Sequence, residues 1–168
     1  MKSPSGAVQS DSAALQMPGV FRFETDFAGS LHCVPMSVRM KLDQVGIKLS
    51  LKQWNRVPHA ERRQLIEQPC DGASETESYK RNVAALIEKH TSTAVEFAAV
   101  DESPAWAETN AVPERICEWA RSVGVAPPTL PRWAALTPLQ RFALFKLTRP
   151  GHSNDNFLPA MREFGILT

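Results

Sequence analysis

The side chains best suited to metal chemistry in this chain are two cysteines and one histidine, which lie far apart in the sequence. Cys33, Cys70 and His152 offer two thiolates and an imidazole, a donor set that suits zinc or another transition metal. Cys33 and Cys70 stand near the two ends of one predicted helical unit, so a helical hairpin could bring them together. Free cysteine is also among the most buried residue types, and the alternative is that both thiols pack in a core or a turn.

A second group of candidates lies on one predicted helix. Arg39 and Asp43 are four residues apart and would share a helix face as an ion pair. Together with Lys41 they could instead form a polar patch that binds another protein. The plain alternative is a solvated helix face with no binding role.

Two further cations, Arg141 and Lys146, lie on a predicted helix that is apolar on nearly every side. A buried cation normally needs a carboxylate, so these two residues could form a functional polar site, or could simply be paired within the fold. Lys146 should either extend to the surface or meet a carboxylate, and Asp43 or an acidic residue of a partner could supply it.

A dense polar turn separates the last two predicted helices and contains His152, Asn154 and Asn156. These side chains could hold an anion at the start of the final helix. They could equally serve only as a helix N-cap, because asparagine is a favoured capping residue.

No sequence-local catalytic motif accompanies these residues. The chain has no G-x-S-x-G nucleophile turn, no phosphate-binding P-loop, no H-E-x-x-H metal motif and no glycine fingerprint for dinucleotides. Any catalysis would have to come from residues that are distant in the sequence. We therefore assign no catalytic residues and expect no bound cofactor.

Composition limits the classes of partner. The 168 residues carry a formal net charge of +1, with 43% hydrophobic and 22% charged residues, as expected of one globular domain. This charge argues against nucleic-acid binding, and a helix-turn-helix regulator would need a basic recognition helix that is missing. The chain has neither an apolar run long enough to span a membrane nor a signal-peptide core near its start, so we expect a cytoplasmic protein. Its three well-separated cysteines match neither a disulfide framework nor a zinc-finger spacing.

The helix that carries Arg141 and Lys146 has the clearest start signal. Thr137 is a good N-cap, Pro138 suits the first helical position, and Gln140 can complete a capping box with Thr137. The residues that follow are so apolar that the helix should lie inside the fold rather than on its surface.

Two stretches of the chain resemble each other. Residues 34–47 match residues 112–125 at a spacing of 78, with proline at each start and glycine at each end. Residues 51–57 then match residues 130–136 at a spacing of 79, with a tryptophan in each. We interpret units of about 34–70 and 112–150 as a diverged tandem duplication, each a helix, a glycine stop, a short tryptophan-bearing turn and a second helix. Chance similarity of two proline-started helices is the alternative.

The remaining segments complete an all-α prediction. A capping box from Ser74 to Glu77 introduces a helix over about 75–90, with one apolar face. Residues 91–111 should form an irregular crossover held to the surface by Trp106. A final short helix should have Pro159 in its first turn and end at Gly165.

We expect a compact helical bundle of two pseudo-repeated hairpins, a central amphipathic helix and an extended N-terminal arm. The arm would cover residues 21–27 and use Phe21, Phe23 and Phe27 as apolar plugs. Residues 1–19 should be a disordered tail, because they are rich in small residues and show no periodicity. Residues 20–168 should then form a single helical domain.

Several motifs together resemble the nitrate reductase-associated protein family. The first part of the chain carries F-x-F-E-x-D-F at 21–27, S-L-x-C-x-P-M at 30–36, V-R at 38–39, K-L-D at 41–43 and G-I-K-L at 46–49. The later part carries L-x-x-W at 51–54, P-C at 69–70, L-T-P-L-Q-R-F-A-L at 136–144, K-L at 146–147 and H-x-N-x-N-F-x-P-A at 152–160. The resemblance covers residues 20–165.

The resemblance implies a role in nitrate assimilation. Members are best known from cyanobacteria, where their genes lie beside those of assimilatory nitrate reductase and of the molybdenum cofactor. It implies a non-catalytic accessory protein that supports the assembly, maturation or activity of this molybdenum- and iron–sulfur-containing enzyme by binding it. Metal or cofactor handling for the same enzyme is the alternative, and the resemblance supplies no catalytic residues.

Overall fold

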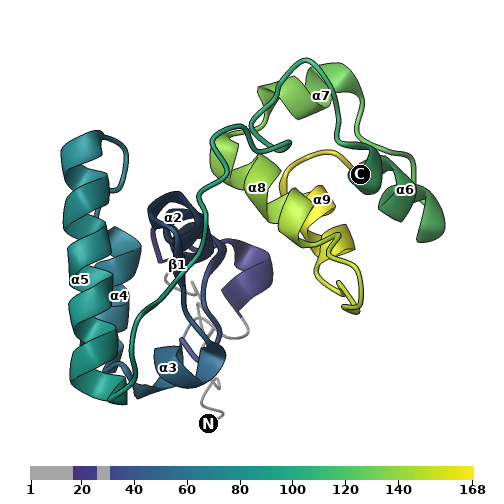
Figure 1. Ribbon diagram of the computed structural model, residues 1–168. Helices are drawn as coiled ribbons and strands as arrows, with labels where there is room; N and C mark the ends of the chain where they lie inside the picture. Colours follow the sequence, from purple (N-terminus) through teal and green to yellow (C-terminus); the bar gives the residue numbers. More distant parts are fainter. Residues whose placement is uncertain (1–16, 26–30) are drawn as a thin grey trace, which may run out of the picture.

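The computed structural model describes residues 17–25 and 31–168, and these residues are mostly helical (Figure 1). Residues 1–16 of the predicted tail lie outside the described residues, and so does Phe27 of the predicted arm. The elements in chain order are η1 (Arg22–Glu24), α2 (Met36–Val45), β1 (Ile47–Lys48), α3 (Leu51–Arg56), α4 (His59–Glu67), α5 (Ala73–Thr91), β2 (Glu96–Phe97), α6 (Glu114–Ser122), α7 (Leu130–Ala135), α8 (Pro138–Lys146) and α9 (Phe157–Glu163).

The first half of the chain gathers α2 to α5 around one apolar cluster, and α5 is its longest helix. The face of α5 predicted from helical spacing is buried at Tyr79, Val83, Leu86 and Ile87. The capping box predicted at its start is wrong, because α5 begins two residues earlier with Gly72 as N-cap and no side-chain cap. The polar residues from 74 to 77 lie within the helix instead, since nothing in that stretch breaks its backbone hydrogen bonding.

The second half packs α6 to α9 around a second cluster, with α8 at its centre. The start predicted for α8 is confirmed: Thr137 is the N-cap, Gln140 completes the capping box, and Pro138 is the first helical residue. Phe142, Ala143 and Leu144 are fully buried, as the apolar composition of this helix predicts. The final helix also matches its prediction, with Pro159 in its first turn and Gly165 in the left-handed region at its end.

Corresponding elements recur in the two halves. Helices α2, α3 and α4 occupy the positions in the first stretch that α6, α7 and α8 occupy in the second. Trp54 and Trp133 are both fully buried, and each indole nitrogen donates to a backbone carbonyl, at 2.6 and 2.8 Å. The tryptophan-bearing segments are six-residue helices rather than the predicted turns, because Ser50 and Thr129 cap them. The tandem duplication itself stays a prediction.

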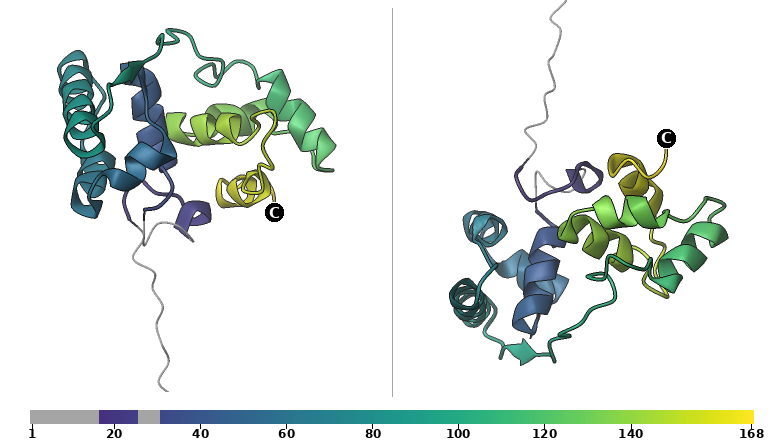
Figure 2. Two further views of the ribbon diagram at one scale, coloured as in Figure 1. Left: turned by 60° about the horizontal axis from the view of Figure 1, so that its bottom comes forward. Right: turned by 90° about the horizontal axis from the view of Figure 1, so that it is seen from above.

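The segment between the halves crosses from α5 to α6 (Figure 2). It is mostly irregular, as predicted, but β2 pairs antiparallel with β1 through Ile47 and Phe97. Trp106 in this segment makes an edge-on contact with Phe142 of α8, with ring centroids 5.5 Å apart. The crossover is therefore attached to both halves.

The N-terminal arm is not extended as predicted, because residues 22–24 form a turn of 3-10 helix. Phe21 and Phe23 stack on each other and both contact the Phe164 ring at the end of α9. The Glu163 carboxylate accepts hydrogen bonds from the backbone N–H groups of residues 22 and 23, at 2.8 and 3.0 Å. Local aromatic stacking and this carboxylate favour a compact turn over a strand.

The two halves meet mainly where α2 contacts α8, and the arm bridges the other side by contacting α9. Met36, at the start of α2, belongs to the apolar cluster of the second half. Among the described residues no helix is both long and apolar enough to cross a bilayer.

Candidate docking cleft

A cleft of about 900 Å³ lies where α2, the arm, the crossover and the end of α8 come together. Six of the eight residues predicted to bind a partner line it, and they come from both halves of the chain. They are Arg39, Asp43, Lys146, His152, Asn154 and Asn156. Residues separated by more than one hundred positions therefore share one concave surface.

Lys146 and Asp43 join the two sides of this cleft. The Lys146 ammonium lies 2.7 Å from Asp43 Oδ2, which confirms that Lys146 meets a carboxylate. The ion pair predicted between Arg39 and Asp43 is wrong, because Arg39 Nε instead donates to the carbonyl of Val34 at 2.8 Å. The side chains of Lys146 and Asp43 are 34% and 52% exposed. Because exposed ion pairs contribute little to stability, we expect this pair mainly to orient the two side chains in the cleft.

The turn at 152–156 forms the rim of the cleft. Asn154 adopts a left-handed φ of 52° and its side-chain amide donates to the carbonyl of Arg149 at 3.0 Å. Asn156 is the N-cap residue of α9, but its side chain makes no capping hydrogen bond. The predicted capping role is therefore not filled by Asn156, and its side chain remains in the cleft wall.

Two arginines that sequence reasoning overlooked, Arg115 and Arg149, also line the cleft. Arg115 stands where the first unit has Ser37, at the repeat spacing of 78, so the repeat gives no signal for a functional arginine here. Arg149 directly precedes the polar turn. Burial, and then the charge of Arg149, lower the pKa of Arg115. The two cations therefore lie close enough to repel each other.

Glu24 supplies a partly buried carboxylate to the wall, and this residue was also overlooked. Its oxygens accept from the backbone N–H groups of Phe21 and Met36, at 3.0 and 2.8 Å. Burial raises the pKa of Glu24 above its usual value, although these hydrogen bonds and Arg39 oppose the shift. Glu24 thus attaches the arm to the start of α2.

A family model described as conserved nitrate reductase-associated protein matches residues 20–164. The chain belongs to this family. No curated protein and no solved structure gives a significant match. The match spans both halves and every element that lines the cleft, and of the described residues it leaves out only 17–19 and 165–168.

Two of the predicted partner-binding residues, Lys41 and Arg141, lie outside the lining of the cleft and make hydrogen bonds within the fold. The Lys41 ammonium donates to the carbonyls of Leu65, Ile66 and Gln68 at the end of α4, and burial lowers its pKa. Arg141 is buried, and its guanidinium donates to the carbonyls of Leu136 and Trp106. The expectation that Arg141 needs a carboxylate is wrong, because two backbone carbonyl oxygens accept hydrogen bonds from its guanidinium.

The alternative metal ligands of this family member are not assembled. Cys33 and His152 line the cleft, whereas Cys70 is buried in a smaller pocket beside Lys41. Burial raises the pKa of the Cys70 thiol, which disfavours the thiolate that a metal would bind. Within residues 17–25 and 31–168, no group of three or more histidine, cysteine or acidic side chains is placed to hold a metal ion.

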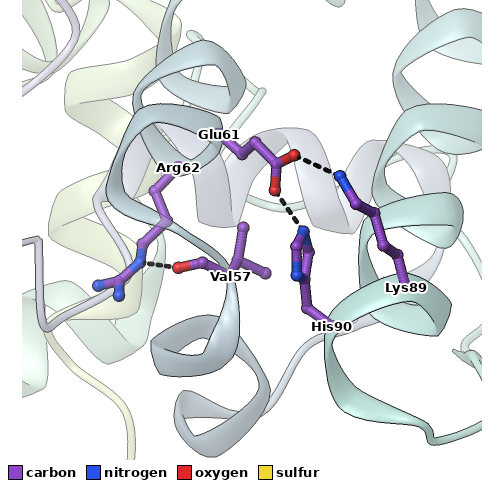
Figure 3. A network of polar contacts seen from close by, with 5 residues as sticks. All are labelled: Val57, Glu61, Arg62, Lys89 and His90. Carbon is purple, nitrogen blue, oxygen red and sulfur yellow. Dashed lines mark hydrogen bonds and ion pairs between the residues drawn. The ribbon is translucent and has the colours of Figure 1, made fainter.

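A separate polar network joins α4 to α5 (Figure 3). Glu61 lies 2.9 Å from the Lys89 ammonium and 2.5 Å from His90 Nε2, and its pKa is lowered chiefly by the hydrogen bond from Lys89. Arg62, the residue after Glu61, points away from α5, and its Nε donates to the carbonyl of Val57 at 2.6 Å. These contacts hold two helices together, and none of the residues lines the cleft.

Proposed function

We propose that this chain is a cytoplasmic, non-catalytic accessory protein that binds nitrate reductase, a molybdenum and iron–sulfur enzyme. In this role it supports the assembly, maturation or activity of the reductase. Membership of the nitrate reductase-associated family over residues 20–164 is the observation that carries the proposal.

The geometry of the cleft supports a binding role. Its polar residues are held on rigid elements: Arg39 and Asp43 on α2, and Lys146 on α8. Contacts among them, such as the Lys146–Asp43 pair, fix their positions before any partner arrives. A pre-organised surface loses less entropy on association, which favours specific binding.

Deletion of the gene tests the accessory role directly. Nitrate reductase activity should fall while the reductase transcript stays unchanged, because the protein acts after transcription. Purified reductase from the deletion strain should then be assayed for molybdenum and iron, to separate a maturation defect from a loss of direct activation. Full activity in the deletion strain would end the proposal.

Complementation of the deletion strain tests the cleft. The variant His152→Glu changes an exposed cleft residue, and His59→Glu makes the same change at an exposed position on α4. His59→Glu should restore reductase activity, whereas His152→Glu should restore it only in part, because the added charge alters the docking surface. Equal restoration by both would place the docking surface elsewhere and leave the accessory role standing.

A further inference from the structure

Cations in the cleft wall fall into two classes, those paired with a carboxylate and those without one. Lys146 pairs with Asp43, and Lys48 with Glu96 at 2.5 Å. Among the ion pairs formed by the described residues, none includes Arg39, Arg115 or Arg149. None of these three guanidinium groups therefore forms an ion pair within the described part of the chain, although the charge of Arg39 lowers the pKa of the Glu24 carboxyl.

Arg115 is held in place by the end of α8. Its Nε donates to the hydroxyl of Thr148 at 3.0 Å and one terminal nitrogen donates to the carbonyl of Phe145 at 2.6 Å. The guanidinium carbon lies 3.7 Å from the centre of the Phe145 ring. The other terminal nitrogen makes no hydrogen bond to the described residues. A guanidinium fixed in this way loses little entropy when it binds an anion.

The arrangement of Arg115 and Arg149 leaves an electrostatic strain that an anion would relieve. Burial lowers the pKa of the Arg115 guanidinium first, and the charge of Arg149 lowers it further. A carboxylate between them would replace this repulsion with charge-assisted hydrogen bonds, which are short and strong. Four acidic residues, Glu24, Asp43, Asp101 and Asp155, also line the wall and would repel the same anion, so the arginines define where it binds.

The size and lining of the cleft favour a segment of protein over a small oxyanion. A volume of about 900 Å³ lies near the upper end of the range of about 300–1,000 Å³ typical of pockets for drug-sized ligands. Apolar side chains line it beside the arginines, among them Phe23, Leu42 and Leu147. A chain segment that carries both acidic and apolar side chains would contact both kinds of surface.

We propose that the cleft binds an acidic segment of a partner protein. Carboxylates of the segment pair with Arg39, Arg115 and Arg149, and a neighbouring apolar side chain packs on the apolar part of the wall. The identity of the partner as nitrate reductase rests on the proposed function, whereas the chemistry of the cleft does not.

A labelled peptide tests the chemistry. A short fluorescein-labelled peptide, rich in glutamate and with one central phenylalanine, is titrated with the full chain and followed by fluorescence anisotropy. We expect Arg39→Gln and Arg149→Gln each to weaken binding roughly five- to tenfold, and to reduce its dependence on salt. Arg81→Gln removes the same charge from an exposed site on α5 outside the cleft and should bind as the unaltered chain does. A lysine-rich peptide of equal length should not bind.

Each other outcome has a definite meaning. Failure of the acidic peptide to bind, or equal affinity for all variants, overturns the proposal. Inorganic pyrophosphate that binds with arginine dependence while the peptide does not would also overturn it, in favour of a small-anion site. The same variants are then tested against purified reductase. Reductase binding that is insensitive to Arg39→Gln and Arg149→Gln overturns the cleft assignment alone, and peptide binding without reductase binding overturns the proposed function alone.

Discussion

Arginine recurs at one position of three helices. Arg39, Arg62 and Arg141 are each the fourth residue of their helix, and each donates to the carbonyl five residues earlier. The accepting residues are buried aliphatics, namely Val34, Val57 and Leu136. Each guanidinium thus binds the carbonyl just before the N-cap and fixes the angle at which the chain enters the helix.

Removal of one such arginine should cost stability. We expect Arg141→Met to lower the free energy of unfolding by about 2–4 kcal/mol, because the carbonyls of Leu136 and Trp106 lose a donor. Urea denaturation followed by circular dichroism measures this. Arg81→Met, at an exposed site, should change it by less than about 0.5 kcal/mol, and a similar loss in both variants would refute the role of Arg141.

The pKa of Glu24 makes stability depend on pH. Because this pKa is raised above 4.5 by burial, the native state holds the proton more tightly than the unfolded state. The free energy of unfolding should therefore fall as pH rises from about 4.5 through the raised value. Arg39 and Glu163 both act on this group, the first lowering the pKa and the second raising it.

Glu24→Gln isolates this contribution. The difference in unfolding free energy between the unaltered chain and the variant should change with pH only in that window, and should shift in favour of the variant toward neutral pH. Parallel stability curves for the two proteins would contradict the assignment.

At the scale of elements, two glycines at matching positions meet different surroundings. Gly46 at the end of α2 has φ of 65°, and an added Cβ would lie 2.5 Å from the carbonyl oxygen of Ala98. Gly124 after α6 has φ of 78°, but a Cβ there would meet only open space. The first glycine is needed both for its conformation and for the approach of the crossover, the second for its conformation alone.

Alanine substitution separates these two requirements. We expect Gly124→Ala to cost about 1 kcal/mol, from the left-handed backbone alone. Gly46→Ala should cost more than about 2 kcal/mol, because the crossover must also move away from α2. Thermal and urea denaturation of the two variants measure the difference, and equal losses would show that the crossover adapts freely.

Local signals predicted the elements whose causes are local. The capping box at Thr137, the apolar face of α5 and the glycine stop at Gly46 depend on neighbouring residues, and each is present. The pairing of β1 with β2 and the turn of residues 22–24 depend on distant partners, which periodicity does not reveal. The sequence likewise placed seven cleft residues among its candidates, six as partner-binding residues and Cys33 as a metal ligand. It wrongly assigned Arg141 to a carboxylate, because one of the two carbonyls that Arg141 binds belongs to the distant crossover.

At the scale of the whole molecule, two apolar clusters share one connecting helix. The first cluster contains residues from 20 to 87 and the second contains residues from 116 to 161, while α2 contributes to both. The prediction of one domain over residues 20–168 requires that the two halves unfold together.

Native-state hydrogen exchange with mass spectrometry tests the single domain. Amides in α5 and α8 should open with the same free energy and the same dependence on denaturant, because loss of either cluster exposes α2. Two distinct opening free energies would instead define two domains.

The hydrogen bonds from the backbone of residues 22 and 23 to Glu163 bear on whether the chain tolerates circular permutation. Because the carboxylate holds backbone N–H groups, it selects no particular side chains, and it brings the first and last described elements against each other. The chain therefore returns, at its last described helix, to the element at which its described part begins. A permuted gene that joins these ends with a short linker and begins within the crossover should encode the same packing.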